Sequence, residues 1–256
     1  DMTALVCGRT LQVLATAGNY NNAIGLPLTL LQLKGSHQVG ILEMGMNAPG
    51  EIAYLAKISE PNLGVVLNIG PGHLAGVGSL EGVVKAKGEL VESLGRAGTA
   101  VLNADDRRVA ALARKAAGPV VTFGRTKGAD VQATQVRKTG AGLSFDMQLP
   151  RAGVCREVKI PAFGDYMLTN ALAAAAIGDL LGVPGPEIKK GLESFFPAPG
   201  RMNIIQTAAG VYVIDDTYNA NPGSMEAAIS GLCAVKGESR GVLVVGDMYE
   251  LGEYAA

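Results

Sequence analysis

Short apolar runs alternate with amphipathic stretches over the first half of the chain. Four of the runs are continuously apolar, a pattern typical of parallel strands that are buried on both faces. They lie at residues 39–43, 63–68, 99–103 and 119–123. Amphipathic helix patterns lie between or after them, at residues 50–59, 79–95 and 106–117. This alternation predicts an α/β fold, with a mostly parallel sheet flanked by helices.

The pattern changes near residue 128. Apolar and polar residues alternate over 131–136, 143–149 and 154–160, which predicts a small antiparallel sheet with one face in solvent. An alanine-rich helix is then expected over 169–181, and a second helix over 186–195.

Residues 196–200 contain two prolines and a glycine and read as a linker. Behind them the strand and helix patterns restart, with strands predicted at 211–215 and 242–245 and a helix from Pro222. We therefore expect two domains, residues 1–199 and residues 200–256.

Composition excludes several classes of protein. Of the 256 residues, 22 are Lys or Arg and 23 are Asp or Glu, so the net charge of −1 excludes a basic protein that wraps nucleic acid. The hydrophobic share of 48% excludes a disordered chain. No apolar stretch is long enough for a membrane span, so we expect no membrane insertion. Cys7, Cys155 and Cys233 lie too far apart in sequence for a zinc site, and we expect three buried thiols.

Acidic residues stand where several of the predicted strands end. Glu43 closes the first strand, Asp105 and Asp106 follow the third, and Asp216 follows the first strand behind the linker. Ligands of open parallel sheets bind at this edge, and Mg²⁺ prefers carboxylate oxygens. The alternative is that each acid caps the next helix, which we favour for Asp105 and Asp106. Glu43 is followed by a glycine-containing segment instead of a helix, so a ligand role is stronger there.

The helix predicted at 79–95 places a lysine in its apolar face. The apolar stripe consists of Leu80, Val83, Val84, Leu90, Val91 and Leu94. At 100° per residue Lys87 lies in the middle of this stripe, and Lys85 lies on the opposite face. Burial lowers the pKa of an amine, and a neutral amine is a nucleophile, including toward carbon dioxide. The alternative is that the stem of Lys87 lies on the core while its ammonium reaches water.

Two further observations leave the chemistry open. His73 lies in a glycine-rich loop at 70–76, where a lone histidine is either a surface residue or a ligand. The chain contains no Gly-x-x-x-x-Gly-Lys-Ser/Thr phosphate loop, which by itself argues against an ATPase.

The order and spacing of several segments resemble the Mur ligases, a family of ATP-dependent amide ligases. These segments are residues 18–30, 43–52, 68–74, 78–89, 170–176, 199–201, 215–225 and 246–252. The resemblance implies a central ATPase domain followed by the beginning of a Rossmann-like C-terminal domain. In that family the phosphate loop lies just before the helix with which this chain opens. Truncation then explains its absence, and we expect the chain by itself to be inactive.

The resemblance also implies roles for individual residues. Glu43, His73 and Lys87, the last as a carbamate, would hold Mg²⁺ and serve catalysis. Asn22 would lie near the γ-phosphate of ATP.

The remaining implied contacts are to the nucleotide. Asn170 would contact adenine, and Arg201 and Asp216 would serve the ribose and phosphates. Tyr166 and Met167 depart from the family, which usually has His-Asn at these places. This departure affects the adenine contact.

The implied reaction joins D-alanyl-D-alanine to UDP-N-acetylmuramoyl-tripeptide through an acyl phosphate, in the bacterial cytoplasm, and we expect a monomer. Two alternatives stay open. One is another amide ligase of the same fold, of the folylpolyglutamate or cyanophycin type, and the other is a non-catalytic nucleotide-binding fragment.

Overall fold

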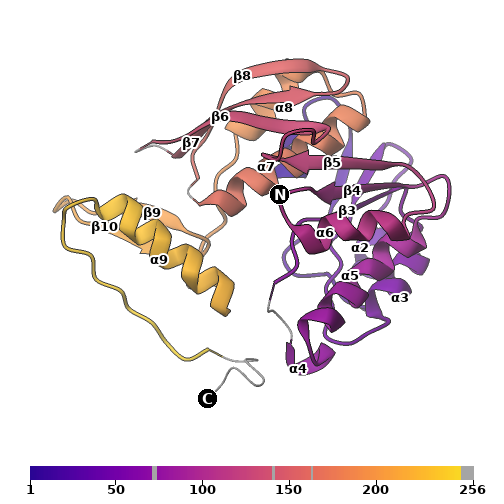
Figure 1. Cartoon of the computed structure of the whole chain (residues 1–256), viewed down its shortest axis with the longest axis horizontal. Coiled ribbons are helices and arrows are strands. Elements are labelled where there is room, and N and C mark those ends of the chain that lie inside the picture. Colours follow the sequence, from indigo (N-terminus) through magenta and orange to yellow (C-terminus); the bar gives the residue numbers. More distant parts are fainter. Residues whose placement is uncertain (71–73, 140–141, 163, 249–256) are drawn as a thin grey trace.

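The computed structural model describes residues 1–70, 74–139, 142–162 and 164–248. A six-stranded sheet in the order β3-β4-β5-β6-β7-β8 forms its centre (Figure 1). The parallel strands are β3 (Leu63–Val66), β4 (Thr99–Asn103), β5 (Val120–Gly124) and β6 (Val131–Thr139). The antiparallel strands β7 (Gly142–Leu149) and β8 (Gly153–Ile160) continue the same sheet. The predicted α/β class is confirmed. The strands predicted from alternating apolar and polar residues continue the parallel sheet.

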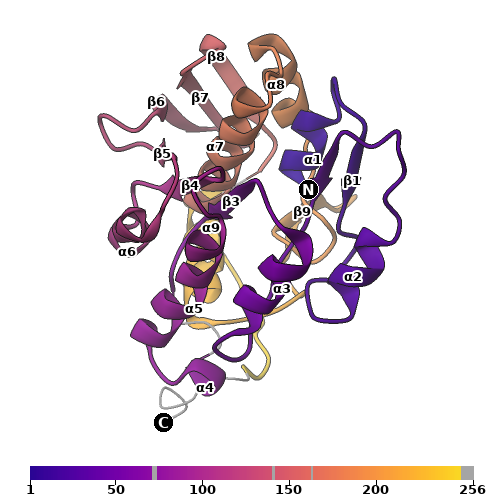
Figure 2. The same ribbon diagram turned by 90° about the vertical axis from the view of Figure 1, so that its right-hand side faces the viewer.

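Helices cover both faces of this sheet (Figure 2). One face carries α1 (Met2–Cys7), α7 (Asp165–Leu180) and α8 (Gly185–Glu193). The other carries α3 (Glu51–Ser59), α5 (Leu80–Ser93), α6 (Arg107–Ala111) and the 3-10 helix η1 (Leu112–Lys115). Each layer encloses its own hydrophobic core.

The alanine-rich helix α7 is buried over most of its length, beyond its exposed first turn. Every residue from 171 to 179 is buried, and the helix packs on β4, β5, β6 and β7. Small side chains let it lie close to the sheet and to α1, where a Cβ on Gly178 would come within 2.6 Å of Val6 Cγ1. The sheet and α1 therefore fix the position of α7.

A separate two-stranded parallel sheet precedes the main one. It pairs β1 (Val13–Ala15) with β2 (Val39–Ile41), and α2 (Gly25–Leu30) lies between them in sequence. Val13 and Ile41 pack against the same core as α1 and α7. A further short helix, α4 (Leu74–Val77), precedes α5.

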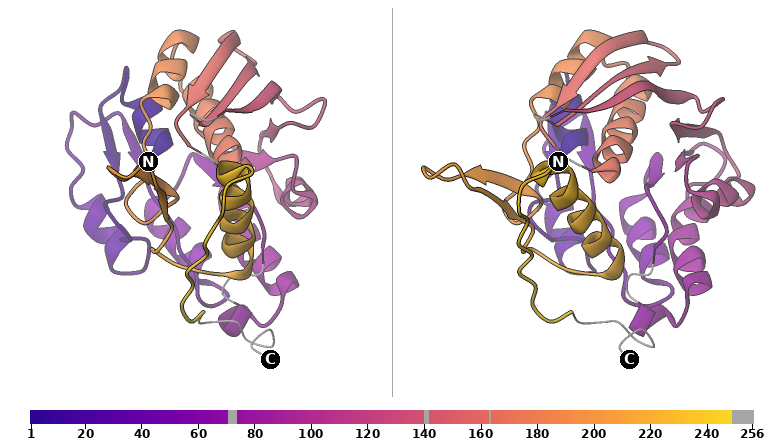
Figure 3. Two further views of the ribbon diagram at one scale, coloured as in Figure 1. Left: turned by 90° about the vertical axis from the view of Figure 1, so that its left-hand side faces the viewer. Right: turned by 60° about the vertical axis from the view of Figure 1, so that its left-hand side comes forward.

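The part behind the linker is an antiparallel ribbon with one helix. The ribbon pairs β9 (Asn203–Gln206) with β10 (Tyr212–Asp215) and extends away from the rest of the chain (Figure 3). It is followed by α9 (Pro222–Lys236), which Asn221 and Ser224 cap reciprocally.

Two expectations for this part are wrong. Residues 242–245 form no strand, because no described strand lies beside them, and Val244 is 89% exposed. Cys7 and Cys155 are buried as expected, but Cys233 is exposed, since it lies on a side of α9 that no described element covers. No described helix is both long and apolar enough to cross a membrane.

A candidate ligand site at the carboxyl edge of the sheet

Glu43 lies just beyond β2, where its backbone and its side chain are held by different residues. Its backbone N–H donates to Thr16 Oγ1 at 3.0 Å. Its carboxylate Oε1 accepts from Asn21 Nδ2 at 2.8 Å. The side chain is exposed and makes no other hydrogen bond within the described part of the chain. One carboxylate oxygen is therefore available to a cation or a ligand donor.

Asn22 begins the turn into α2. Its Oδ1 accepts from the backbone N–H of Ile24 at 3.0 Å and of Gly25 at 2.9 Å. The oxygen is thus used by the start of the helix, and the side-chain amide Nδ2 is the group left for a ligand. Such a donor suits a phosphate oxygen, which only accepts.

Lys87 is half-buried on α5, whereas Lys85 is exposed, so the predicted faces of this helix are confirmed. Lys87 Nζ donates to the backbone carbonyl oxygen of Asn68 at 2.7 Å, just beyond the end of β3. Burial lowers the pKa of the Lys87 amine, and the carboxylate of Asp106 opposes this shift. A larger fraction of this amine is therefore neutral than in an exposed lysine.

Two hydrogen-bonded contacts fix α5 and hence Lys87. Ser79 caps the helix by accepting from the backbone N–H of Gly82 at 3.2 Å. Glu89, one half-turn beyond Lys87, accepts from the backbone N–H groups of Gly50 and Ala53 at 2.8 and 3.1 Å. The second contact caps α3 from the side and ties the two helices together.

Asp105 and Asp106 follow β4 in the sequence and accept hydrogen bonds from different segments. Asp106 caps α6, as expected, because its Oδ1 accepts from the backbone N–H groups of Arg108 and Val109. Its Oδ2 also accepts from Ile69 N at 2.7 Å, which joins the ends of β3 and β4.

The capping expectation is wrong for Asp105. Its carboxylate accepts from the backbone N–H groups of Arg125 and Thr126 and from the Thr126 hydroxyl, and so it orders the turn behind β5. Burial alone would raise the pKa of Asp105, but these hydrogen bonds outweigh burial and lower it.

A second group of residues gathers around the linker. The Arg201 guanidinium lies 4.2 Å from the centre of the Tyr218 ring. Asp216 Oδ1 accepts from Met202 N at 3.0 Å. Burial, and secondarily the Asp216 carboxylate, raises the pKa of Tyr166 to about 12, while Arg201 opposes the shift. The structure therefore brings Tyr166 of α7 toward Arg201 and Asp216.

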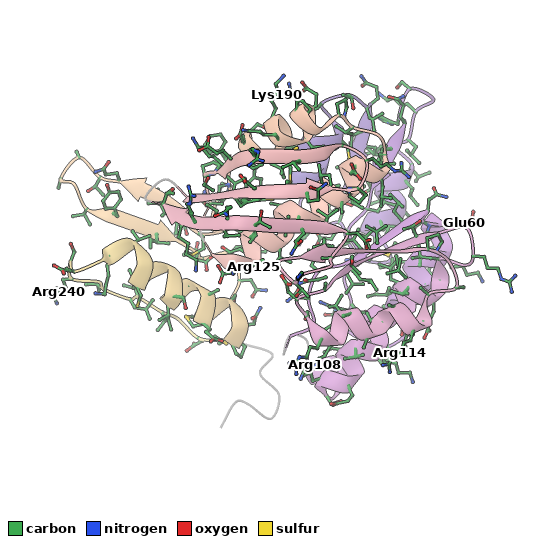
Figure 4. All side chains as sticks on the ribbon, turned by 45° about the horizontal axis from the view of Figure 1, so that its top comes forward. Glu60, Arg108, Arg114, Arg125, Lys190 and Arg240 are labelled. Atoms are coloured by element: carbon green, nitrogen blue, oxygen red, sulfur yellow. The ribbon has the colours of Figure 1, made fainter. Side chains whose placement is uncertain are left out.

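A cavity of 490 Å³ opens next to this group. Its walls come from the strand ends and from α7: Asp105, Arg125, Thr126, Asp165, Tyr166, Leu168, Thr169 and Leu172. Arg125 lies toward the centre of the molecule, whereas Arg108 and Arg114 lie at its outer edge (Figure 4). Asn170, the predicted adenine contact, follows Thr169 on α7 and is not one of the residues that line this cavity.

Glu43 and Arg201 both lie near the start of α1. Burial lowers the pKa of the Asp1 N-terminal amine, and the Glu43 carboxylate and the Arg201 guanidinium shift this pKa in opposite directions. Met44 and Met46, which follow Glu43, pack in the same core as α5. The segment behind β2 therefore runs alongside the helix that carries Lys87.

The predicted metal ligands are only partly described. His73 lies outside the described residues, and no three His, Cys, Asp or Glu side chains within the described ranges form a metal cluster. Glu43 and Lys87 are described. Glu43 lies just beyond β2, and Lys87 lies on α5 with its Nζ against the backbone at the end of β3.

Sequence reasoning gave no site role to Asn21 or Asn103. Asn103 is buried, and its Nδ2 donates to Leu67 O at 2.8 Å, which joins β4 to the end of β3. In the sequence, Asn103 ends a predicted strand and Asn21 precedes Asn22. Neither position by itself indicates a role in the site.

Comparison with known proteins shows to which family the chain is similar. Two family models match the chain, the Mur ligase middle domain over residues 1–178 and the Mur ligase glutamate ligase domain over residues 200–256. The UDP-N-acetylmuramoyl-tripeptide–D-alanyl-D-alanine ligase of Escherichia coli is 39% identical over 264 residues, which covers 98% of this chain and 55% of that protein.

Solved structures give the same result. A crystal structure of MurF from Acinetobacter baumannii superimposes with a TM-score of 0.90 at 37% identity, covering 98% of this chain and 54% of that one. The MurF ligase of Thermotoga maritima, in complex with ADP, gives 0.76 at 26% identity, with 90% and 53% covered. This chain thus spans about half the length of the relatives it matches. Because the first family model matches more than half of the residues, the chain belongs to the Mur ligase family.

Proposed function

We propose that the protein is an ATP-dependent ligase that joins D-alanyl-D-alanine to UDP-N-acetylmuramoyl-tripeptide in the synthesis of peptidoglycan precursors in the bacterial cytoplasm. The observation that carries the proposal is the half-buried amine of Lys87 at the carboxyl edge of a mostly parallel sheet. The name of the Escherichia coli protein supports this choice of substrates.

The reaction proceeds in two transfers. The terminal carboxylate of the tripeptide attacks the γ-phosphorus of ATP, which gives an acyl phosphate and ADP. The amine of D-alanyl-D-alanine then attacks the acyl carbon, loses a proton and expels inorganic phosphate as the amide forms. Positioning and electrostatic stabilisation dominate such transfers.

Four of the described side chains would contact different parts of the nucleotide. Asn22 Nδ2 would donate to a γ-phosphate oxygen, and Asn170 of α7 would contact the adenine. Arg201 and Asp216 hold the ribose and phosphates from behind the linker. The ADP complex of the Thermotoga maritima relative supports nucleotide binding by this fold.

The donor set of Glu43 fits a magnesium ion. Mg²⁺ is commonly bound by one or two carboxylates together with substrate phosphates, and Glu43 presents one carboxylate oxygen that no described residue occupies. His73 would be a second ligand. When bound, the ion neutralises charge on the phosphates.

Lys87 fits the metal only after modification, because an ammonium repels a cation. Its neutral amine would attack the carbon of carbon dioxide, forming a nitrogen–carbon bond as one C–O π bond opens. Loss of a proton from the nitrogen then gives a carbamate, whose single negative charge is shared by two oxygens. The lowered pKa favours this step, because it raises the neutral fraction.

We also propose that residues 1–199 and 200–256 are separate domains, which close on the nucleotide between Asn170 and Arg201. The exposed linker residue Phe196 supports a hinge there. Small-angle scattering of the complete protein should show compaction with an ATP analogue and tripeptide substrate. Identical profiles would refute the closure.

The test of function uses the protein expressed from its complete open reading frame. Phosphate release should require ATP, UDP-N-acetylmuramoyl-tripeptide and D-alanyl-D-alanine together. Preference for L-glutamate as the amine would indicate the folylpolyglutamate type, and absence of any amine-dependent release would indicate a non-catalytic nucleotide-binding protein. The 256-residue chain assayed by itself should release no phosphate.

A further inference from the structure

We propose that Asn21 is a positioning residue for Glu43. Its side-chain amide fixes one carboxylate oxygen of Glu43, so that the other oxygen is presented to a divalent cation. The inference rests on the proposed function for the identity of that cation and its nucleotide.

Asn21 contacts the segment behind β2 at two points. Its Nδ2 donates to Glu43 Oε1 at 2.8 Å, and its backbone carbonyl accepts from Gly45 N at 2.7 Å. Thr16 adds a third contact, since its hydroxyl accepts from Glu43 N. The loop between β1 and α2 therefore holds both the backbone and the carboxylate of this segment.

The chemistry of the pair allows only one arrangement. An ionised carboxylate accepts and cannot donate, so the amide nitrogen of Asn21 must face it. An exposed glutamate otherwise samples several rotamers, and ordering it on cation binding costs free energy. A hydrogen bond that is present beforehand reduces this cost, which is the role of outer-shell partners at metal sites.

Gly45 offers an independent way to disturb the same contact. A Cβ at this position would lie 3.0 Å from Cγ, Nδ2 and Oδ1 of Asn21. Its φ lies outside the positive range, so alanine fits the backbone, and the added methyl group displaces the amide by a few tenths of an ångström. Gly45→Ala is therefore a mild version of removing the amide.

The experiment measures Mn²⁺ binding by electron paramagnetic resonance, in the complete protein with a non-hydrolysable ATP analogue. Asn21→Ala should weaken Mn²⁺ binding about tenfold, and Gly45→Ala should weaken it less. The matched control is Asn19→Ala in the same loop, because Asn19 contacts Asn21 through its backbone carbonyl alone. This control should bind Mn²⁺ as the unchanged protein does.

A second readout separates positioning from damage to the fold. In Asn21→Ala the Mg²⁺ concentration for half-maximal turnover should rise, while turnover at saturating Mg²⁺ recovers. If Asn21→Ala disturbs the fold, turnover is lost at every Mg²⁺ concentration. In that case the milder variant Gly45→Ala tests the positioning role.

The outcomes distinguish this inference from the proposed function. Unchanged Mn²⁺ affinity in both Asn21→Ala and Gly45→Ala, together with weakened affinity in Glu43→Gln, would overturn the positioning role alone. Unchanged affinity in Glu43→Gln would remove Glu43 from the metal site. Absence of D-alanyl-D-alanine-dependent turnover in the unchanged protein would overturn the function, whatever the Mn²⁺ result.

Discussion

Carboxylates follow both β2 and β4, yet their surroundings differ. Behind β4, Asp105 and Asp106 each accept three hydrogen bonds from protein N–H or O–H groups. Behind β2, Glu43 accepts one, from Asn21. A position at the end of a strand is therefore not enough to make an acidic residue a ligand. The number of donors that the protein itself supplies separates a structural carboxylate from one that is available to a cation.

The largest effect is expected at Lys87, whose amine lies against the end of β3. Lys87→Ala in the complete protein should lower turnover about 1000-fold, since it removes the carbamate that would hold Mg²⁺ beside the phosphates. Lys85→Ala, on the exposed face of α5, should be nearly silent. Phosphate release at saturating Mg²⁺ is the measurement.

A short carboxylic acid added to Lys87→Ala should restore part of the activity, because it can fill the space of the carbamate. If Lys87→Ala turned over at the rate of the unchanged protein, the Lys87 ammonium would only extend into water and would have no role in the reaction.

At the end of β2, Glu43→Gln should lower turnover about 100-fold with little change in the free energy of unfolding. Glutamine keeps an oxygen that accepts from Asn21 and loses only the charge. Kinetics and urea unfolding of the same preparation test both parts. A variant that unfolds more easily and retains turnover would place Glu43 with the structural acids.

At the end of β4 the opposite result is expected. Asp106→Ala removes the cap of α6 and the acceptor for Ile69 N, and should lower the free energy of unfolding by about 1–2 kcal/mol. Asp106→Asn keeps one acceptor oxygen and should cost less. Equal unfolding of all three proteins would contradict the assignment.

The smallest effect concerns the pH dependence of Asp105. Its pKa is lower in the folded protein than the ordinary value of 3.8, so its hydrogen bonds contribute stability above that pH. The contribution is lost as the pH falls through the folded pKa. The difference in unfolding free energy between the unchanged protein and Asp105→Asn should therefore shrink from about pH 5 to pH 2. A difference that stays constant would contradict this.

Sequence patterns predicted what depends on local periodicity. The parallel strands, the face of α5 that carries Lys87 and the presence of the alanine-rich helix all follow from the residues themselves. The three-residue strand β1 is too short to show a period. Residues 242–245 have the composition of a strand, but a strand forms only beside a partner, which local sequence does not report.

The contacts of the candidate site depend on long-range pairing, which the sequence does not encode locally. Asn21 meets Glu43 across 22 positions, and Asp105 meets Thr126 across 21. Tyr166 of α7 and Asp216, which follows β10, interact although they lie far apart in the sequence. Acids at strand ends could be named from the sequence, but their donors could not.

The dense packing of α7 has a consequence for saturation mutagenesis. Five buried alanines have no room for a larger side chain, so most substitutions there will reduce the amount of folded protein: Ala171, Ala173, Ala174, Ala175 and Ala176. In a survey scored by growth, these alanines will look as intolerant as Lys87, although none of them touches a substrate. Intolerance in α7 reports a packing distance and intolerance at Lys87 reports chemistry, so the two separate only when abundance and turnover are scored for each variant.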